Sequence, residues 1–336
     1  PAWTSNPIDT FILERLDEQG LAPAPEADRV TLARRLYLDL TGLPPTRSQV
    51  NEIRSMKDFD REWPEVVRRV THQPAYGERM AVFWLDLVRF ADTVGYHGDQ
   101  DHSISPYRDY VIKAFNENMP YDQFTREQLA GDLLPEVTLW QHIATGYNRL
   151  LQTSHEGGVQ DKEYLAKYAA DRVRNFGLVW MGATTGCAEC HNHKYDPYTI
   201  EDFYQLASFF SDLKQQGAYQ AANAIPTTRL PEIQAWNLTQ FAQWQALDTR
   251  LASLSQEADL DPGIAHALSE KKQALKATFA PCMVSQAVEP RPMRVLPRGN
   301  WLDESGDPVL PGTPGFLPAL KVSSNPSRLD LANWLF

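Results

Sequence analysis

The feature that most constrains the fold is a helical spacing of apolar residues that recurs along most of the chain. Ile8, Phe11 and Ile12 fall on one face of a first helix. Asp28 and Thr46 stand where they can cap the two helices that follow. Further helices are expected at about 60–71, 77–91, 106–118, 121–131, 138–150 and 161–180. The sequence therefore predicts a mainly α protein, built as a multi-helix array.

Composition and charge narrow the classes of function. Of the 336 residues, 43% are hydrophobic, enough for a sizeable buried core. The net charge is −11, whereas an extended phosphate-binding surface needs clustered Lys and Arg. A membrane-spanning helix needs about 18 consecutive apolar residues, and the sequence has no such run. Nucleic acid is not expected as a partner, and the protein is not expected to span a membrane.

Changes in composition and periodicity along the sequence predict three parts of the chain. Residues 1–212 form the helical array, and 213–280 hold a polar helical hairpin with helices at 231–256 and 262–279. Residues 281–336 carry short extended pieces and many Pro and Gly residues, typical of a linker that leads into a second domain. The sequence opens without Met and stops inside an apolar helix, so we expect a truncated chain whose remainder is one of its partners.

The motif with the clearest chemistry is Cys187-Ala188-Glu189-Cys190-His191. Cys-x-x-Cys-His is the attachment signature of c-type haem. The thiols of Cys187 and Cys190 reach the two vinyl groups of one porphyrin, and His191 becomes the proximal ligand of the iron. The sequence therefore predicts one covalent haem c.

Other chemistries stay open for the same residues. Cys187 and Cys190, with His191 or His193, are also ligands for structural zinc, and Cys282 is available as a fourth. A redox-active dithiol, a plain disulfide and free thiols are further alternatives.

The sixth haem ligand decides between electron transfer and catalysis, because an open coordination position allows a substrate to bind. The main candidates are Met181, Met293, His155 and His193, with Met283, His97 and His102 as further ones. A Met residue, however, often serves only to fill gaps in a core.

Two polar loops are candidates for substrate binding. Residues 90–102 hold several Asp and His residues, and 154–158 place His155 beside two glycines. Asp92, His155 and His193 are the candidate bases that take a proton from a substrate hydroxyl.

Longer motifs resemble the planctomycete-type cytochrome domain family, PSCyt2. They are NPID at 6–9, DLTGLPP at 39–45, YGER at 76–79, WLDLVRFAD at 84–92, YRDYVI at 107–112, NMPYD at 118–122, EQLAGDLLP at 127–135 and CAECHNHKYDP at 187–197. The resemblance covers about 1–212, and 286–336 resemble the beginning of the family's usual partner domain, PSD1. It implies a secreted or periplasmic protein associated with the breakdown of complex polysaccharides.

These observations lead to one hypothesis and two alternatives. We expect a c-type haem oxidoreductase of the periplasm or cell exterior that acts on a carbohydrate or polyol. Its partners are then that substrate or a redox partner protein. A plain electron-transfer cytochrome is the first alternative, although about a hundred residues suffice to wrap one haem. The second is a zinc-stabilised module that binds or hydrolyses polysaccharides.

Overall fold

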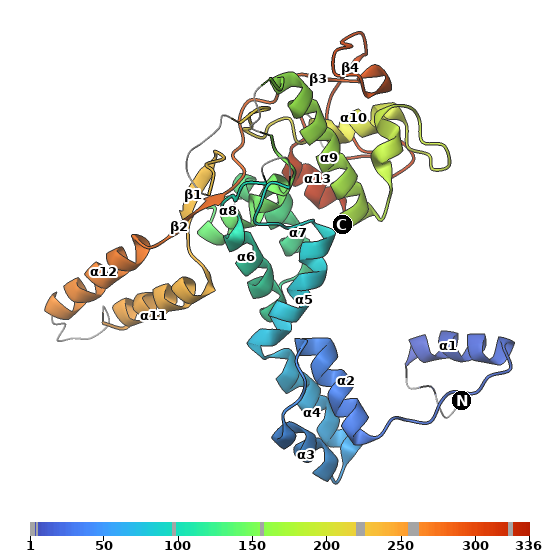
Figure 1. The fold of residues 1–336 in the computed structure, drawn as a ribbon, viewed down its shortest axis with the longest axis vertical. Coiled ribbons are helices and arrows are strands. Elements are labelled where there is room, and N and C mark those ends of the chain that lie inside the picture. The colour runs from blue at the N-terminus through green and yellow to red at the C-terminus, as the bar shows by residue number, and fades with distance from the viewer. Residues whose placement is uncertain are drawn as a thin grey trace. The chain divides into compact units, whose positions relative to one another are not determined.

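Helices make up most of the computed structural model, which describes residues 4, 6–95, 99–154, 158–219, 226–254, 262–321 and 325–336 (Figure 1). The prediction of a mainly α protein is confirmed. The contacts divide the chain into two units, Pro1–Tyr76 and Gly77–Phe336, each with its own core.

The Pro1–Tyr76 unit starts with four helices: α1 (Pro7–Glu18), α2 (Arg29–Thr41), α3 (Arg47–Ser55) and α4 (Phe59–Thr71). The expected caps are confirmed, because Asp28 accepts from the N–H groups of Val30 and Thr31, and Thr46 accepts from that of Gln49. Helices α2 to α4 share a small core that includes Ile53. The predicted apolar stripe of α1 is exposed, since none of its residues is buried.

The Gly77–Phe336 unit holds the larger core. Its α-helices are α5 (Pro74–Leu87, which begins in the first unit), α6 (Ser105–Asn116), α7 (Tyr121–Ala130), α8 (Leu139–Ala144), α9 (Asp161–Met181), α10 (Ile200–Ser208), α11 (Leu238–Leu254), α12 (Pro262–Lys276) and α13 (Arg328–Trp334). The 3-10 turns are η1 (Gly131–Leu133), η2 (Thr145–Arg149), η3 (Thr185–Glu189) and η4 (Pro297–Gly299). Two short antiparallel pairs join β1 (Glu232–Ala235) to β2 (Ala280–Met283) and β3 (Met293–Arg294) to β4 (Pro308–Val309).

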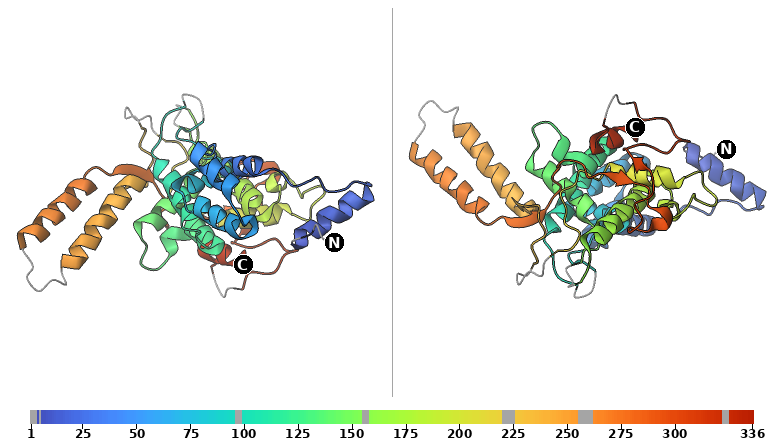
Figure 2. Two further views of the ribbon diagram at one scale, coloured as in Figure 1. Left: turned by 90° about the horizontal axis from the view of Figure 1, so that it is seen from below. Right: turned by 90° about the horizontal axis from the view of Figure 1, so that it is seen from above.

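The predicted helical hairpin is present as α11 and α12, which lie side by side in both views of Figure 2. Helix α11 begins at Leu238 and not at 231, so the prediction of helix for the first residues was wrong. The reason is a long-range pairing, in which Ile233 lies opposite Cys282 in the β1–β2 ladder. Aromatic contacts join the hairpin to α8, with Trp140 and Phe241 ring centroids 5.1 Å apart.

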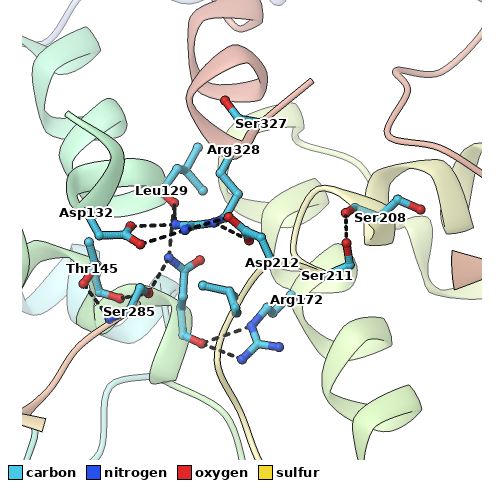
Figure 3. Close-up of polar contacts among 12 residues, drawn as sticks. Leu129, Asp132, Thr145, Arg172, Ser208, Ser211, Asp212, Ser285, Ser327 and Arg328 are labelled. Carbon is cyan, nitrogen blue, oxygen red and sulfur yellow. Dashed lines mark hydrogen bonds and ion pairs between the residues drawn. The ribbon is translucent and has the colours of Figure 1, made fainter. Parts of the chain in front are cut away.

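The last fifty residues pack into the same unit as the helices before them. Helix α13 packs against α7, and Leu331 and Ala332 are fully buried. Arg328 is also fully buried, and its guanidinium pairs with Asp132 and Asp212 at 2.8 Å each (Figure 3). The division between the two compact units therefore falls after Tyr76 in the chain. The boundaries at 212 and 280 were predicted as divisions between sequence modules, and they stay predictions.

In both units, among the described residues, no helix has both the length and the apolar character needed to cross a membrane.

Candidate functional site

The Cys-x-x-Cys-His motif lies in the short connection between α9 and α10. Helix α9 ends at Met181 and is capped by Gly182, whose φ of 58° lies in the left-handed region that favours glycine. The chain then forms η3, in which the buried Thr185 hydroxyl donates to the carbonyl of Val173 on α9. From α10, the Tyr204 hydroxyl donates to the carbonyl of Glu189 at 3.0 Å. The turn before the motif and its central residue Glu189 are thus held by neighbouring helices.

The two thiols of the motif are free and accessible. Cys187 and Cys190 are both exposed, and they form no disulfide. The Cys190 N–H donates to the Cys187 carbonyl at 3.4 Å, which closes the turn between them. This leaves both sulfur atoms available for a covalent partner.

His191 of the motif and His193, two residues after it, differ in which ring nitrogen carries the proton. The Nδ1 atom of His191 lies 2.7 Å from the carbonyl oxygen of Asn192, and a carbonyl only accepts. Nδ1 of His191 must therefore carry the proton, which leaves the Nε2 lone pair of the neutral ring for a metal. In His193, Nδ1 instead accepts from the backbone N–H groups of Tyr195 and Asp196, at 3.3 and 2.8 Å. The neutral His193 ring then carries its proton on Nε2.

A cavity of about 530 Å³ lies near Cys190: its lining includes Glu189, the preceding residue, but not Cys187, Cys190 or His191. A Cβ built on Gly299 would lie 3.0 Å from the Cys190 sulfur, a close approach, and the φ of 68° at this position favours glycine. Gly299 and Glu189 both line the cavity. Its other walls come from α9, α10 and the strand region, through Asp161, Lys162, Glu163, Leu165, Ala166, Lys167, Ala169, Ala170, Tyr204, Ala207, Phe210, Ser211, Arg291, Pro292, Met293, Arg294, Leu296, Trp301 and Glu304.

Comparison with known families gives a match over most of the helical array. The family PSCyt2, described as "Protein of unknown function (DUF1549)", matches residues 7–215, more than half of the chain. The chain belongs to the PSCyt2 family. Neither the curated proteins nor the solved structures contain a match.

The match to PSCyt2 ends at residue 215, whereas the cavity is completed by residues after it. Arg291, Met293 and Trp301 all come from the segment that was expected to open the partner domain PSD1. That assignment to PSD1 stays a prediction. The sequence singled out Met293 but carried no signal for Arg291 and Trp301, because they share a cavity with Glu189 only across about a hundred residues of chain.

The candidate sixth ligands fall at different places in this PSCyt2 chain. Met293 lines the cavity near Cys190 and packs against the core. Met181 is the last residue of α9 and packs partly buried against that core, while Met283 is buried within it. His155 and His97 lie outside the described residues.

The loop at 90–102 lines a second cavity, of about 300 Å³. His102 is buried there, and its Nε2 lies 2.9 Å from the carbonyl of Ala91, to which it donates. Burial lowers the pKa of His102. Asp92 is exposed, and its carbonyl accepts from the His102 N–H. Neither Asp92 nor His193 is among the residues that line the cavity near Cys190.

The zinc alternative needs ligands that the fold keeps apart. Cys282 is fully buried in β2, where burial raises the pKa of its thiol. Within the described part of the chain, no three His, Cys, Asp or Glu side chains are grouped so that they could hold a metal ion. A zinc site would therefore need rearrangement around Cys187 and Cys190.

Proposed function

We propose that this protein is a c-type haem oxidoreductase of the periplasm or cell exterior that acts on a carbohydrate or polyol. The observation that carries the proposal is the hydrogen bond from His191 Nδ1 to the Asn192 carbonyl, beside two free thiols. Such a bond orients a ligand imidazole and sets its tautomer. The compartment follows from the chemistry, because c-type haem is joined to its protein after export.

The residues of the motif fit a covalently attached haem. Both thiols are exposed, as thioether formation requires, and His191 presents Nε2 to a metal. The cavity near Cys190 adds apolar surface from Phe210 and Leu296. Haem held there would supply one-electron redox chemistry at its iron.

The roles of this chain's own residues follow from their positions. Cys187 and Cys190 would hold the group covalently, and His191 would bind its iron through Nε2. Met293, which lines the cavity, would be a candidate for a further ligand. The neutral His193 ring already carries a proton on Nε2, so it positions the backbone of Tyr195 and Asp196 more readily than it takes a proton.

A plain electron-transfer cytochrome is the second candidate, favoured by the exposure of all three motif residues. An exposed attachment site allows direct electron exchange with a partner protein. The cavity of about 530 Å³ favours the oxidoreductase, because it has the size of a small-molecule site.

The first experiment is production of the protein in a host with c-haem maturation, followed by a pyridine haemochrome assay. We expect covalent haem in the wild type. His191→Ala should lose normal iron ligation, seen as a changed Soret spectrum, whereas the matched control His193→Gln should keep the wild-type spectrum. Cys187→Ala and Cys190→Ala should each weaken covalent attachment.

The outcomes separate the candidates. Carbon monoxide binding to the reduced protein supports an open catalytic position, and its absence supports the electron carrier. Protein that carries no haem, with zinc found by elemental analysis, would rule out both haem functions and favour the zinc module.

A further inference from the structure

The charged side chains around the cavity near Cys190 are mostly neutralised within the protein. Lys162 pairs with Glu304, and Lys167 pairs with Glu163 at 2.5 Å. The remaining lining carboxylates also have partners. Glu189 pairs with Arg174, and the Asp161 carboxylate accepts from the Ala218 N–H at 2.6 Å.

The two lining arginines have carbonyl partners instead. Arg294 donates to the carbonyls of Glu304 and Gly306. Arg291 donates from Nη1 to the Leu213 carbonyl at 2.7 Å. Over the described residues, no carboxylate forms an ion pair with Arg291. Its neighbour Asp212 is engaged with Arg328 at 2.8 and 3.0 Å.

Further positive charge lies near Arg291, on Arg172 and then on Arg149. Arg172, drawn in Figure 3, is buried. It donates to the Asn148 carbonyl and the Gln215 amide oxygen, both uncharged. Arg149 is also buried and donates to the carbonyls of Val284 and Arg229. Burial, and after it the charges of Arg149 and Arg291, lower the pKa of Arg172. Burial also lowers the pKa of Arg291, while the negative charge of Asp212 acts to raise it. Among the described residues, none of Arg291, Arg172 and Arg149 forms an ion pair with a carboxylate; their hydrogen-bond partners are uncharged.

We propose that this cavity binds a small organic carboxylate, with Arg291 as the residue that contacts the carboxylate group. A planar guanidinium is suited to a carboxylate, and buried charges are normally paired. Ala166, Ala170 and Phe210 provide apolar surface for the rest of the ligand. The volume of about 530 Å³ suits a ligand of one or two rings.

A carboxylate in this cavity can come from two sources. One is a free ligand, such as a sugar acid, and this source does not depend on haem. The other is a propionate of haem attached at Cys190, and this source rests on the proposed function.

The first arm of the test uses protein without haem and isothermal titration calorimetry. The probes are D-glucuronate against D-glucuronamide, and benzoate against benzamide, since each pair differs only in the charged group. We expect the acid of at least one pair to bind about tenfold or more tightly than its amide. Arg291→Gln should remove this preference and Arg291→Lys should keep part of it, while the control Arg35→Gln, exposed on α2, should not change it.

The second arm uses haem-loaded protein and measures the midpoint potential and the salt dependence of the Soret band. If the carboxylate is a propionate, Arg291→Gln shifts the potential, Arg35→Gln does not, and the first arm shows no binding. The preference of the unchanged protein for acids over amides tests the proposal even if an Arg291 variant does not fold.

Each outcome decides. An acid preference that depends on Arg291 identifies a free ligand, and a potential that depends on Arg291 identifies a propionate. If neither the acid preference nor the potential depends on Arg291, the proposal is wrong. Failure of the protein to take up haem, with the acid preference intact, would overturn the proposed function and leave this inference standing.

Discussion

Two arginine centres in the Gly77–Phe336 unit are both buried, but only one of them is paired with carboxylates (Figure 3). Around Arg328, two carboxylates surround one guanidinium. Burial opposes that charge, but Asp132 and Asp212 outweigh it and hold the pKa of Arg328 above its ordinary value. Around Arg172, the partners are a carbonyl and an amide, and the pKa is lowered.

The difference indicates two purposes for buried charge. A guanidinium matched by carboxylates joins distant segments, since Arg328 links α13 to η1 and to the residues after α10. A guanidinium matched only by neutral oxygens leaves positive charge for an external anion. The first centre is expected to stabilise the fold, and the second is expected to serve binding.

The largest expected effect is the loss of Arg328. Arg328→Met leaves Asp132 and Asp212 buried without their cation, and we expect it to lower the free energy of unfolding by about 3–5 kcal/mol. The measurement is urea denaturation followed by circular dichroism. The control is Arg126→Met, which removes the side chain that pairs with Asp122 and contacts Asn333 of α13. Because that pair is partly exposed, the control should cost about 1 kcal/mol or less.

A smaller effect is expected at the second centre. Arg172→Met leaves the Asn148 carbonyl and the Gln215 amide oxygen without this donor, which should cost about 1–3 kcal/mol. The relief of repulsion with Arg149 and Arg291 offsets part of the loss. Urea denaturation beside Arg328→Met makes the comparison direct. Equal losses for the two variants would show that the carboxylates do not distinguish the centres.

A third case is a buried ionisable group that is kept neutral, His102. Its folded pKa lies below the ordinary 6.5, so the unfolded chain binds a proton more readily. Stability should therefore fall as the pH drops below about 6.5, and the loss is complete below the folded pKa. His102→Gln should flatten this dependence in urea denaturation between about pH 7.5 and about pH 5.5. An unchanged slope would assign the pH dependence to other groups.

The smallest effect on stability is expected for Arg291→Gln. Because the Arg291 side chain makes one hydrogen bond among the described residues, to a carbonyl at a cavity wall, we expect a change in the free energy of unfolding within about 0.5 kcal/mol. Addition of D-glucuronate should raise the melting temperature of the wild type but not of the variant if the free ligand is the source. A loss as large as that of Arg328→Met would instead make Arg291 a structural residue.

Local signals explain what could be predicted from the sequence. The caps at Asp28 and Thr46 and the hairpin of α11 and α12 depend on residues within a few positions of one another. The Cys187-x-x-Cys190-His191 motif is local in the same way. The first residues of the predicted helix at 231–256 were assigned wrongly because their strand partner lies some fifty residues away.

The sequence by itself determined the helical class, the PSCyt2 family and the Cys-x-x-Cys-His pattern of the motif. Only the tertiary structure decided which histidine of the motif offers Nε2, because that depends on whether Nδ1 meets a carbonyl or an N–H group. It also decided that Gly299 lies against Cys190 and that Arg291 has no carboxylate partner among the described residues. The physical reason is that hydrogen-bond and charge partners are set by contacts between distant segments, whereas helix caps and periodicity are set by neighbours along the chain.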